Sequence, residues 1–273
     1  MIYRAAKAAA RHWLGWEIDQ ELARGFSAEI SQALGRVFTH ALARRLASDW
    51  LAVASPGKNA EAWLDLTYPT LGNTLREALR SVLTRIWHRG WALGEESARD
   101  ALTALQGAGK ASSGATASGS AAVIDGEAAY RSWLADAGIE SINGISDTQM
   151  GDLAGALGFA LDTGQSVDEL AAEIASFADA GASVDVISTT ELARAVSQAA
   201  LSAYDAAGVT KVAWLTTAGA CVLCSNNELA GEILTGDSFP SGGTAPPAHP
   251  NCRCVLQPAA MAGVDLLSIA QAL

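Results

Sequence analysis

Cys221-Val222-Leu223-Cys224 and Pro246-Pro247-Ala248-His249-Pro250-Asn251-Cys252-Arg253-Cys254 are the two stretches that decide how the C-terminal part of this chain folds. They hold all 4 cysteines of the 273 residues and the only histidine after His88. Two cysteines three positions apart, followed at a distance by a histidine and a cysteine at the same spacing, supply the ligands of a closed tetrahedral zinc site. The sequence therefore predicts a metal-binding subdomain in this region.

Five candidate ligands compete for the four positions of such a site. We rank Cys221, Cys224, His249 and Cys252 first, with Cys254 as the alternative fourth ligand. Cys252 and Cys254 are two positions apart, which on a strand sends both side chains to the same face. Four protein ligands leave no position for water, so we expect a zinc ion that stabilises the fold and not a catalytic one.

Three other interpretations of the cysteines stay open. Two disulfides fit the even count, although four cysteines are few for a secreted disulfide scaffold and we expect no signal peptide. A thioredoxin-like redox pair needs its C-x-x-C at the start of a helix, whereas residues 225–227, Ser-Asn-Asn, predict a turn. Unligated buried thiols would leave the clustering of His249, Cys252 and Cys254 unexplained.

A longer pattern of residues surrounds these two stretches. It consists of Thr190, Glu191, Arg194, Tyr204, Gly208, Val209, Trp214, Cys221, Cys224, Gly231, Pro246, Pro247 and the run from His249 to Cys254. In order and spacing this pattern resembles the phage head morphogenesis domain of Mu F-like minor capsid proteins, over about residues 125 to 258. Relatives commonly carry an acidic residue where Gly219 and Ala220 precede Cys221, so any role of that carboxylate is absent here.

The resemblance implies a structural minor capsid protein of a tailed phage or prophage-derived particle. Such a protein assembles in the host cytoplasm, docks on the portal protein beside other capsid proteins, and stays in the virion inside the capsid at the portal vertex. The alternatives are an assembly factor that is not retained, or a small zinc-dependent enzyme. We expect no enzyme, because the sequence offers no Ser/His/Asp set, glycine-rich phosphate loop or open metal site.

The sequence predicts a mainly α fold of the α+β class, in four parts. Residues 1–106 form an N-terminal helical hairpin or bundle, which we interpret as the docking region. Residues 107–120, rich in glycine, serine and alanine, are expected to be a flexible linker. Residues 121–258 form a helical domain that ends in a small β zinc-knuckle subdomain, and residues 259–273 are a short tail.

Helical periodicity and capping signals place the expected helices. Apolar residues recur every three or four positions on Leu22, Phe26, Ile30, Leu34, Val37 and Ala41, and again on Leu71, Leu75, Leu79, Val82 and Ile86. These stripes predict two long helices separated by a break at residues 55–59. Capping boxes that begin at Ser146, Ser166 and Ser188 predict later helices over 147–162, 167–179 and 189–207, after one at 125–137. Three strands are expected at 210–216, 232–235 and 253–257.

Charge is distributed unevenly along the chain, whose net charge is −11. Residues 1–106 carry 13 Lys and Arg against 11 Asp and Glu, whereas residues 107–273 carry 5 against 18. Because nucleic-acid affinity comes largely from cations that neutralise phosphates, we expect no direct DNA binding by the C-terminal domain. No apolar run approaches the roughly 18 residues of a membrane span, so no membrane contact is expected.

Six of the eight tryptophans lie in the N-terminal region, at Trp13, Trp16, Trp50, Trp63, Trp87 and Trp91. Aromatic residues at helical spacing usually pack into a core. Tryptophan and arginine are also enriched at protein interfaces, so an anchoring surface is the second interpretation.

Overall fold

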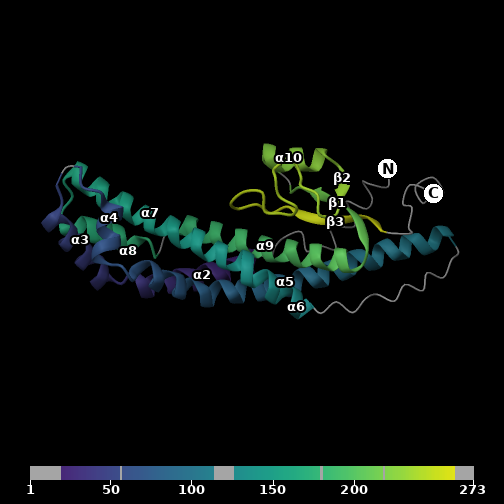
Figure 1. Cartoon of the computed structure of the whole chain (residues 1–273), viewed down its shortest axis with the longest axis horizontal. Coiled ribbons are helices and arrows are strands. Elements are labelled where there is room, and N and C mark those ends of the chain that lie inside the picture. The colour runs from purple at the N-terminus through teal and green to yellow at the C-terminus, as the bar shows by residue number, and fades with distance from the viewer. Residues whose placement is uncertain (1–19, 56, 114–125, 179–180, 218, 262–273) are drawn as a thin grey trace. The chain divides into compact units, whose positions relative to one another are not determined.

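The computed structural model describes residues 20–55, 57–113, 126–178, 181–217 and 219–261. Its fold is mainly α-helical with a small antiparallel sheet near the C-terminal end, which confirms the predicted fold class (Figure 1). In chain order the elements are α2 (Gln20–Val37), α3 (His40–Val53), α4 (Ala60–Thr67), α5 (Leu71–Ser113), α6 (Gly126–Trp133), the π-helix η1 (Leu134–Gly138), α7 (Ile139–Thr163), α8 (Val167–Ser176), α9 (Gly181–Ala206), β1 (Val209–Leu215), α10 (Val222–Leu229), β2 (Glu232–Leu234) and β3 (Val255–Met261). None of the helices in these ranges is long and apolar enough to cross a membrane.

Two compact units make up the chain, and each is built from segments far apart in the sequence. We call residues 24–85 and 133–188 the helical unit, and residues 86–132 and 189–273, with those up to 23, the sheet unit. Both units therefore draw on both sides of the expected linker at 107–120. The helix α5 continues through residues 107–113, although two glycines and two serines there disfavour helix locally, and residues 114–120 lie outside the described ranges. The division at that linker stays a prediction.

Aromatic side chains form part of the core in both units. In the helical unit, Trp50 is fully buried, donates from Nε1 to the Leu157 carbonyl at 2.7 Å, and packs on Trp63 with ring centroids 5.0 Å apart. In the sheet unit, Trp87 and Trp91 are buried as well. The core interpretation therefore applies to these four tryptophans, while Trp13 and Trp16 lie outside the described residues, as does the part of the expected tail beyond residue 261.

The three capping boxes predicted from the sequence have different outcomes. Ser166 caps α8 with the predicted reciprocal bonds to Glu169, which confirms that helix start. Ser146 and Ser188 lie instead inside the continuous helices α7 and α9, so the predicted starts at 147 and 189 are wrong. Both serines are buried, and tertiary contacts satisfy them: Ser146 donates to the Gly72 carbonyl at 3.4 Å, and Ser188 bonds the Ser27 hydroxyl at 2.9 Å.

The first predicted long helix is interrupted in the structure. α2 ends at Val37 and α3 begins at His40, because the Thr39 hydroxyl accepts a hydrogen bond from the Leu42 backbone N–H and caps α3. A threonine at this position satisfies a backbone donor that the first turn of a helix leaves free. The apolar period continues across Thr39, so periodicity alone does not reveal the break.

The three predicted strands form one antiparallel sheet in the order β2-β1-β3 (Figure 1). The third begins at Val255 instead of residue 253 and ends at Met261, inside the expected tail. The central strand β1 pairs with β2 through Val212 opposite Ile233, and with β3 through Leu215 opposite Val255. Because the strands run in opposite directions, the end of β1 lies beside the start of β3. The segment that follows β1 therefore begins at the same end of the sheet at which the segment before β3 finishes.

Within the sheet unit, α5 and α9 pack closely at two glycines of α5. A Cβ atom added at Gly94 would stand 2.3 Å from the Val196 carbonyl oxygen and 2.7 Å from the Ala199 Cβ. One added at Gly90 would stand 2.8 Å from the Ala195 Cβ. Real Cβ atoms do not approach other atoms so closely, so this crossing requires glycine at both positions.

We expect Gly94→Ala to lower the free energy of unfolding by about 1 to 3 kcal/mol, because the added methyl group overpacks the α5–α9 contact. The matched control is Gly155→Ala in α7, an exposed helical glycine with no atom within 4 Å of the added Cβ. Better helix propensity should raise stability there by up to about 1 kcal/mol. Urea unfolding followed by circular dichroism measures both effects, and a neutral Gly94→Ala would contradict the packing described.

Candidate metal centre

Two chain segments meet at the edge of the sheet where β1 ends and β3 begins. The first leads from Leu215 to the N-terminus of α10 and carries Cys221 and Cys224. The second is the loop from residue 235 to 254, which carries His249, Cys252 and Cys254 and leads into the start of β3. The antiparallel β1–β3 register thus brings together ligands that are 28 residues apart, such as Cys221 and His249.

The first pair of cysteines lies at the start of a helix. Cys221 is the N-cap of α10, and the N–H of Ser225 donates to the Cys221 carbonyl at 2.9 Å to close the first turn. The expected turn at residues 225–227 is therefore wrong, and so is the reason it gave against a redox pair, because the C-x-x-C does lie at the start of a helix. The reason is long-range: Asn227 points into the unit and its amide bonds Ser241, so an asparagine that locally favours a turn is held inside a helix.

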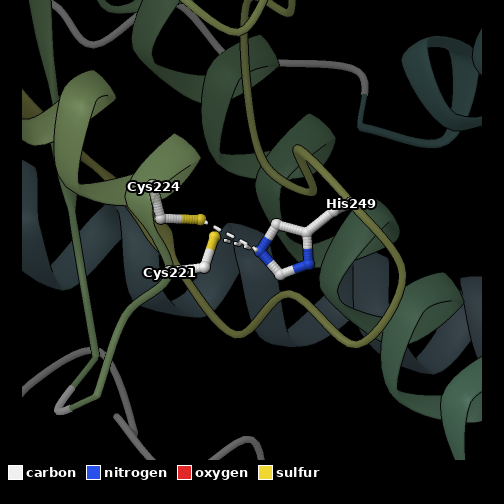
Figure 2. A group of neighbouring side chains, drawn as sticks. All are labelled: Cys221, Cys224 and His249. Carbon is white, nitrogen blue, oxygen red and sulfur yellow. Dashed lines mark hydrogen bonds between the residues drawn. The ribbon is translucent and has the colours of Figure 1, made fainter.

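The His249 imidazole faces both of these cysteines. Its Nε2 lies 3.2 Å from the Cys221 sulfur and 3.2 Å from the Cys224 sulfur, and all three side chains point at one another (Figure 2). Its Nδ1 lies 2.7 Å from the Pro250 carbonyl oxygen. A neutral imidazole that donates from Nδ1 to a carbonyl presents its lone pair on Nε2, which is the usual arrangement of a metal-binding histidine.

Three separations among these atoms fit the edges of a tetrahedral site. Zinc bonds of about 2.3 Å to sulfur and 2.0 Å to nitrogen place two sulfurs roughly 3.8 Å apart, and sulfur and nitrogen roughly 3.5 Å apart. Beside the two S–N separations of 3.2 Å, the Cys224 and Cys252 sulfurs are 3.6 Å apart. These three separations are each close to an edge of the tetrahedron, whereas Cys252 is grouped within 4.8 Å with Cys224 and Cys254 and not with Cys221 and His249.

All five residues predicted from the sequence gather in two overlapping groups that could hold a metal ion. Cys221, Cys224 and His249 form the first group, and Cys224, Cys252 and Cys254 form the second, with the ligand atoms of each group within 4.8 Å of one another. Cys224 belongs to both groups. All four cysteines are free thiols, so the structure contains no disulfide between them. One ion bound at Cys224 can therefore take its other ligands from either group.

Hydrogen bonds and burial lower the pKa of two of the thiols and raise the pKa of the other two. The pKa of Cys221 is lowered, mainly because the Cys224 backbone N–H donates to its sulfur, and that of Cys252 is lowered mainly by a hydrogen bond from Cys254. Burial raises the pKa of Cys224, and the bond to Cys252 raises that of Cys254. Burial lowers the pKa of His249, but the Pro250 carbonyl and the thiolates of Cys252 and Cys221 outweigh it, so the net direction is upward.

The cluster lies against the core of the sheet unit. Cys224, Cys252 and Cys254 are almost fully buried, whereas Cys221 is exposed at the surface. The surrounding core includes Trp214 and Phe239, whose rings meet edge to face at 5.1 Å. An ion in this place would be enclosed by protein on most sides, with its exposed side at Cys221.

Two supporting contacts hold the loop that carries His249 and Cys252. The buried Asn227 donates to the Ser241 hydroxyl at 2.8 Å and accepts from the Ser241 N–H at 2.9 Å, which ties the loop to α10. The Thr190 hydroxyl of α9 accepts from the Asn251 N–H at 2.8 Å. The sequence analysis did not predict these contacts, because each joins residues that are distant along the chain. Its only signal was that Thr190 belongs to the longer residue pattern.

Glu191 has a different role from the helix cap that the sequence suggested. Its buried carboxylate accepts a hydrogen bond from Trp87 Nε1 at 2.9 Å and lies 3.3 Å from Arg194 Nε. Both partners belong to the sheet unit, so the carboxylate joins α9 to α5 there. A buried carboxylate with an indole and a guanidinium as donors is satisfied, which indicates a structural role.

Fold and site together define a mainly helical protein whose small antiparallel sheet carries a Cys/His cluster able to hold a metal ion. Comparison of the chain with known protein families, with curated proteins and with solved structures finds no match.

We expect protein purified without added metal to contain one zinc ion per chain. Its removal by a chelator should lower the midpoint of thermal unfolding, because an ion at about 1,000 times its Kd stabilises the folded state by about 4 kcal/mol. Elemental analysis and thermal unfolding test both statements. The matched control is Cys221→Ser, which should bind zinc poorly and show little response to the chelator. Folded, metal-free protein with two disulfides would contradict the prediction.

The fourth ligand can be identified by two single substitutions. Since the Cys252 sulfur is in contact with that of Cys224, we expect Cys252→Ser to weaken zinc binding more than about 100-fold, which exceeds the effect of losing a supporting residue. Cys254→Ser should keep one zinc ion per chain. Competition with a chromophoric chelator gives the two affinities, and the reverse order would make Cys254 the ligand.

Proposed function

We propose that this chain is a structural minor capsid protein, active in head morphogenesis of a tailed phage or prophage-derived particle. The proposal places it in the virion, inside the capsid at the portal vertex, in contact with the portal protein and other capsid proteins. The main support is that residues of the longer pattern, the one that resembles Mu F-like proteins, pack together around the Cys/His cluster.

This convergence involves residues that are distant in the sequence. Tyr204 and Trp214 belong to the same buried cluster as Cys224, Cys252 and Cys254, and the Tyr204 hydroxyl donates to the Leu256 carbonyl at 3.4 Å. Thr190 contacts the loop at Asn251, and Glu191 and Arg194 are paired one turn along the same helix. A pattern whose members build one core is what the Mu F-like resemblance leads us to expect, and this supports the proposal.

Within this proposal the metal is a structural zinc ion bound by Cys221, Cys224, His249 and Cys252. Three thiolates and an imidazole are ligands that suit zinc, and four of them close its coordination sphere. When bound, the ion joins the segment after β1 to the loop before β3. The chemistry that the ion supplies is therefore cross-linking of the subdomain.

A zinc-dependent enzyme is less well supported than this structural role. Catalytic zinc keeps an open position for water, which the set of Cys221, Cys224, His249 and Cys252 would occupy. Glu191, the buried carboxylate of the longer pattern, is engaged by Trp87 and Arg194. An assembly factor that leaves the particle would share the partners proposed here, and differs only in its absence from mature virions.

We propose that the N-terminal region docks on the portal. The described tryptophans of this region are buried, so they do not provide the surface. Three arginines there are engaged in ion pairs: Arg85 with Glu29 at 2.6 Å, Arg76 with Asp147 at 3.6 Å and Arg80 with Glu77 at 3.5 Å. Leu66 on α4 is 85% exposed, as single surface leucines often are, so it is a position at which docking by this region can be tested and not evidence for it.

Co-expression with the portal protein of the same phage or prophage tests this assignment. We expect the full chain to copurify with the portal and Leu66→Glu to reduce that copurification, because a charge would be buried at the contact. The matched control is Leu229→Glu on α10, where the leucine is 83% exposed, and it should copurify normally. Deletion of residues 1–106 is a poorer test, because α5 contributes to both units.

The other outcomes of this experiment are informative. Loss of copurification only in Leu229→Glu would assign attachment to the sheet unit. Failure of the full chain to copurify with the portal, together with its absence from assembling and mature particles, would refute the capsid proposal. Its presence in assembling particles alone would identify an assembly factor that is not retained.

A further inference from the structure

The loop between His249 and Cys252 has an unusual backbone conformation. Asn251 is the only non-glycine residue with positive φ among the described residues, at 59°. Asparagine tolerates this left-handed region better than most residues, but the conformation still needs support from its surroundings. The Cys252 N–H donates to the His249 carbonyl at 3.2 Å and closes the turn around Asn251. The orientation of both candidate ligands therefore depends on the backbone of Asn251.

One side chain from outside the loop supports this conformation. The Asn251 N–H donates to the hydroxyl of Thr190, 61 residues earlier in the chain, at 2.8 Å. Thr190 is 9% exposed, so water competes little for this bond. Its neighbour Glu191 ties the same turn of α9 to Trp87 of α5, which holds the hydroxyl in a fixed place. A rigid helix thus presents one acceptor to the turn that carries two ligands.

We propose that Thr190 is a positioning residue of the metal centre. Its hydroxyl holds Asn251 in the left-handed conformation, so that His249 Nε2 and the Cys252 sulfur are directed toward Cys224 before the ion binds. This inference rests on the proposed metal site. Residues that hydrogen-bond to metal ligands without touching the metal commonly change metal affinity by about 10- to 100-fold, because they fix the orientation of the ligands before the ion binds.

The test compares three threonine variants of the full-length protein. Thr190→Val keeps the shape of the side chain and removes the acceptor, while Thr190→Ser keeps the hydroxyl. Thr235→Val is the matched control: it makes the same chemical change in the sheet unit and removes a 2.9 Å bond to the carbonyl of Val209, at the end of β1 opposite the one beside the cluster. Zinc affinity is measured by chelator competition, and the absorption spectrum of the cobalt-substituted protein reports the geometry around the ion.

We expect Thr190→Val to weaken zinc binding by about tenfold or more and to alter the cobalt spectrum. Thr190→Ser should restore both properties, and Thr235→Val should leave them unchanged even if it lowers stability. As a second approach, Asn251→Ala should also weaken zinc binding, because alanine adopts the left-handed region less readily than asparagine. This variant leaves α9 untouched, so it tests the inference even if Thr190→Val does not fold.

Different results would overturn the inference and the metal site separately. If Thr190→Val keeps the zinc affinity and cobalt spectrum of the wild type, the positioning role is overturned and the metal site stands. If Thr190→Val does not fold, the same result in Asn251→Ala leads to the same conclusion. Equal losses of affinity in Thr190→Val and Thr235→Val would do the same, since they would reflect general destabilisation. A wild-type protein that binds neither zinc nor cobalt would overturn the metal site, and the positioning role with it.

Discussion

The antiparallel pairing of β1 with β3 is the contact on which the C-terminal part of this molecule depends. Leu215 opposite Val255 joins the end of one strand to the start of the other. The chain between them contributes β2 and then returns to the end of the sheet where β1 stops, and it carries Cys221, Cys224, His249, Cys252 and Cys254. A slip of one residue would turn the side chains of β3 to the opposite face, so the register and the cluster are specified together.

Much of this arrangement could be predicted from the sequence, because the signals are local or chemically distinctive. The three strands, the capping box at Ser166 and the mainly α fold follow from short patterns that the structure confirms. The five thiol and imidazole side chains could be grouped in advance, since few other arrangements explain His249, Cys252 and Cys254 so close together. The spacing of ligands carries information about three-dimensional contact even without a structure.

The features that were missed depend on contacts between distant residues. Ser146 and Ser188 have the local chemistry of helix caps, yet both are buried within longer helices and satisfied by Gly72 and Ser27. Asn227 favours a turn locally, but Ser241 holds it inside α10. In each case a short-range preference of a few tenths to about 1 kcal/mol is overridden by tertiary packing. The contact between Thr190 and Asn251 belongs to the same class.

The discontinuous construction of the two units affects the order in which the chain can fold during synthesis. The helical unit is complete once residue 188 has left the ribosome. The sheet unit is not, because residues 86–132 pack with residues beyond 189, and β3 ends only at Met261. Gly90 and Gly94 must therefore wait for Ala195 and Val196 to be translated. The Cys/His cluster can form only after Cys252 and Cys254 have been translated, so an ion that binds there does so when the helical unit is already complete.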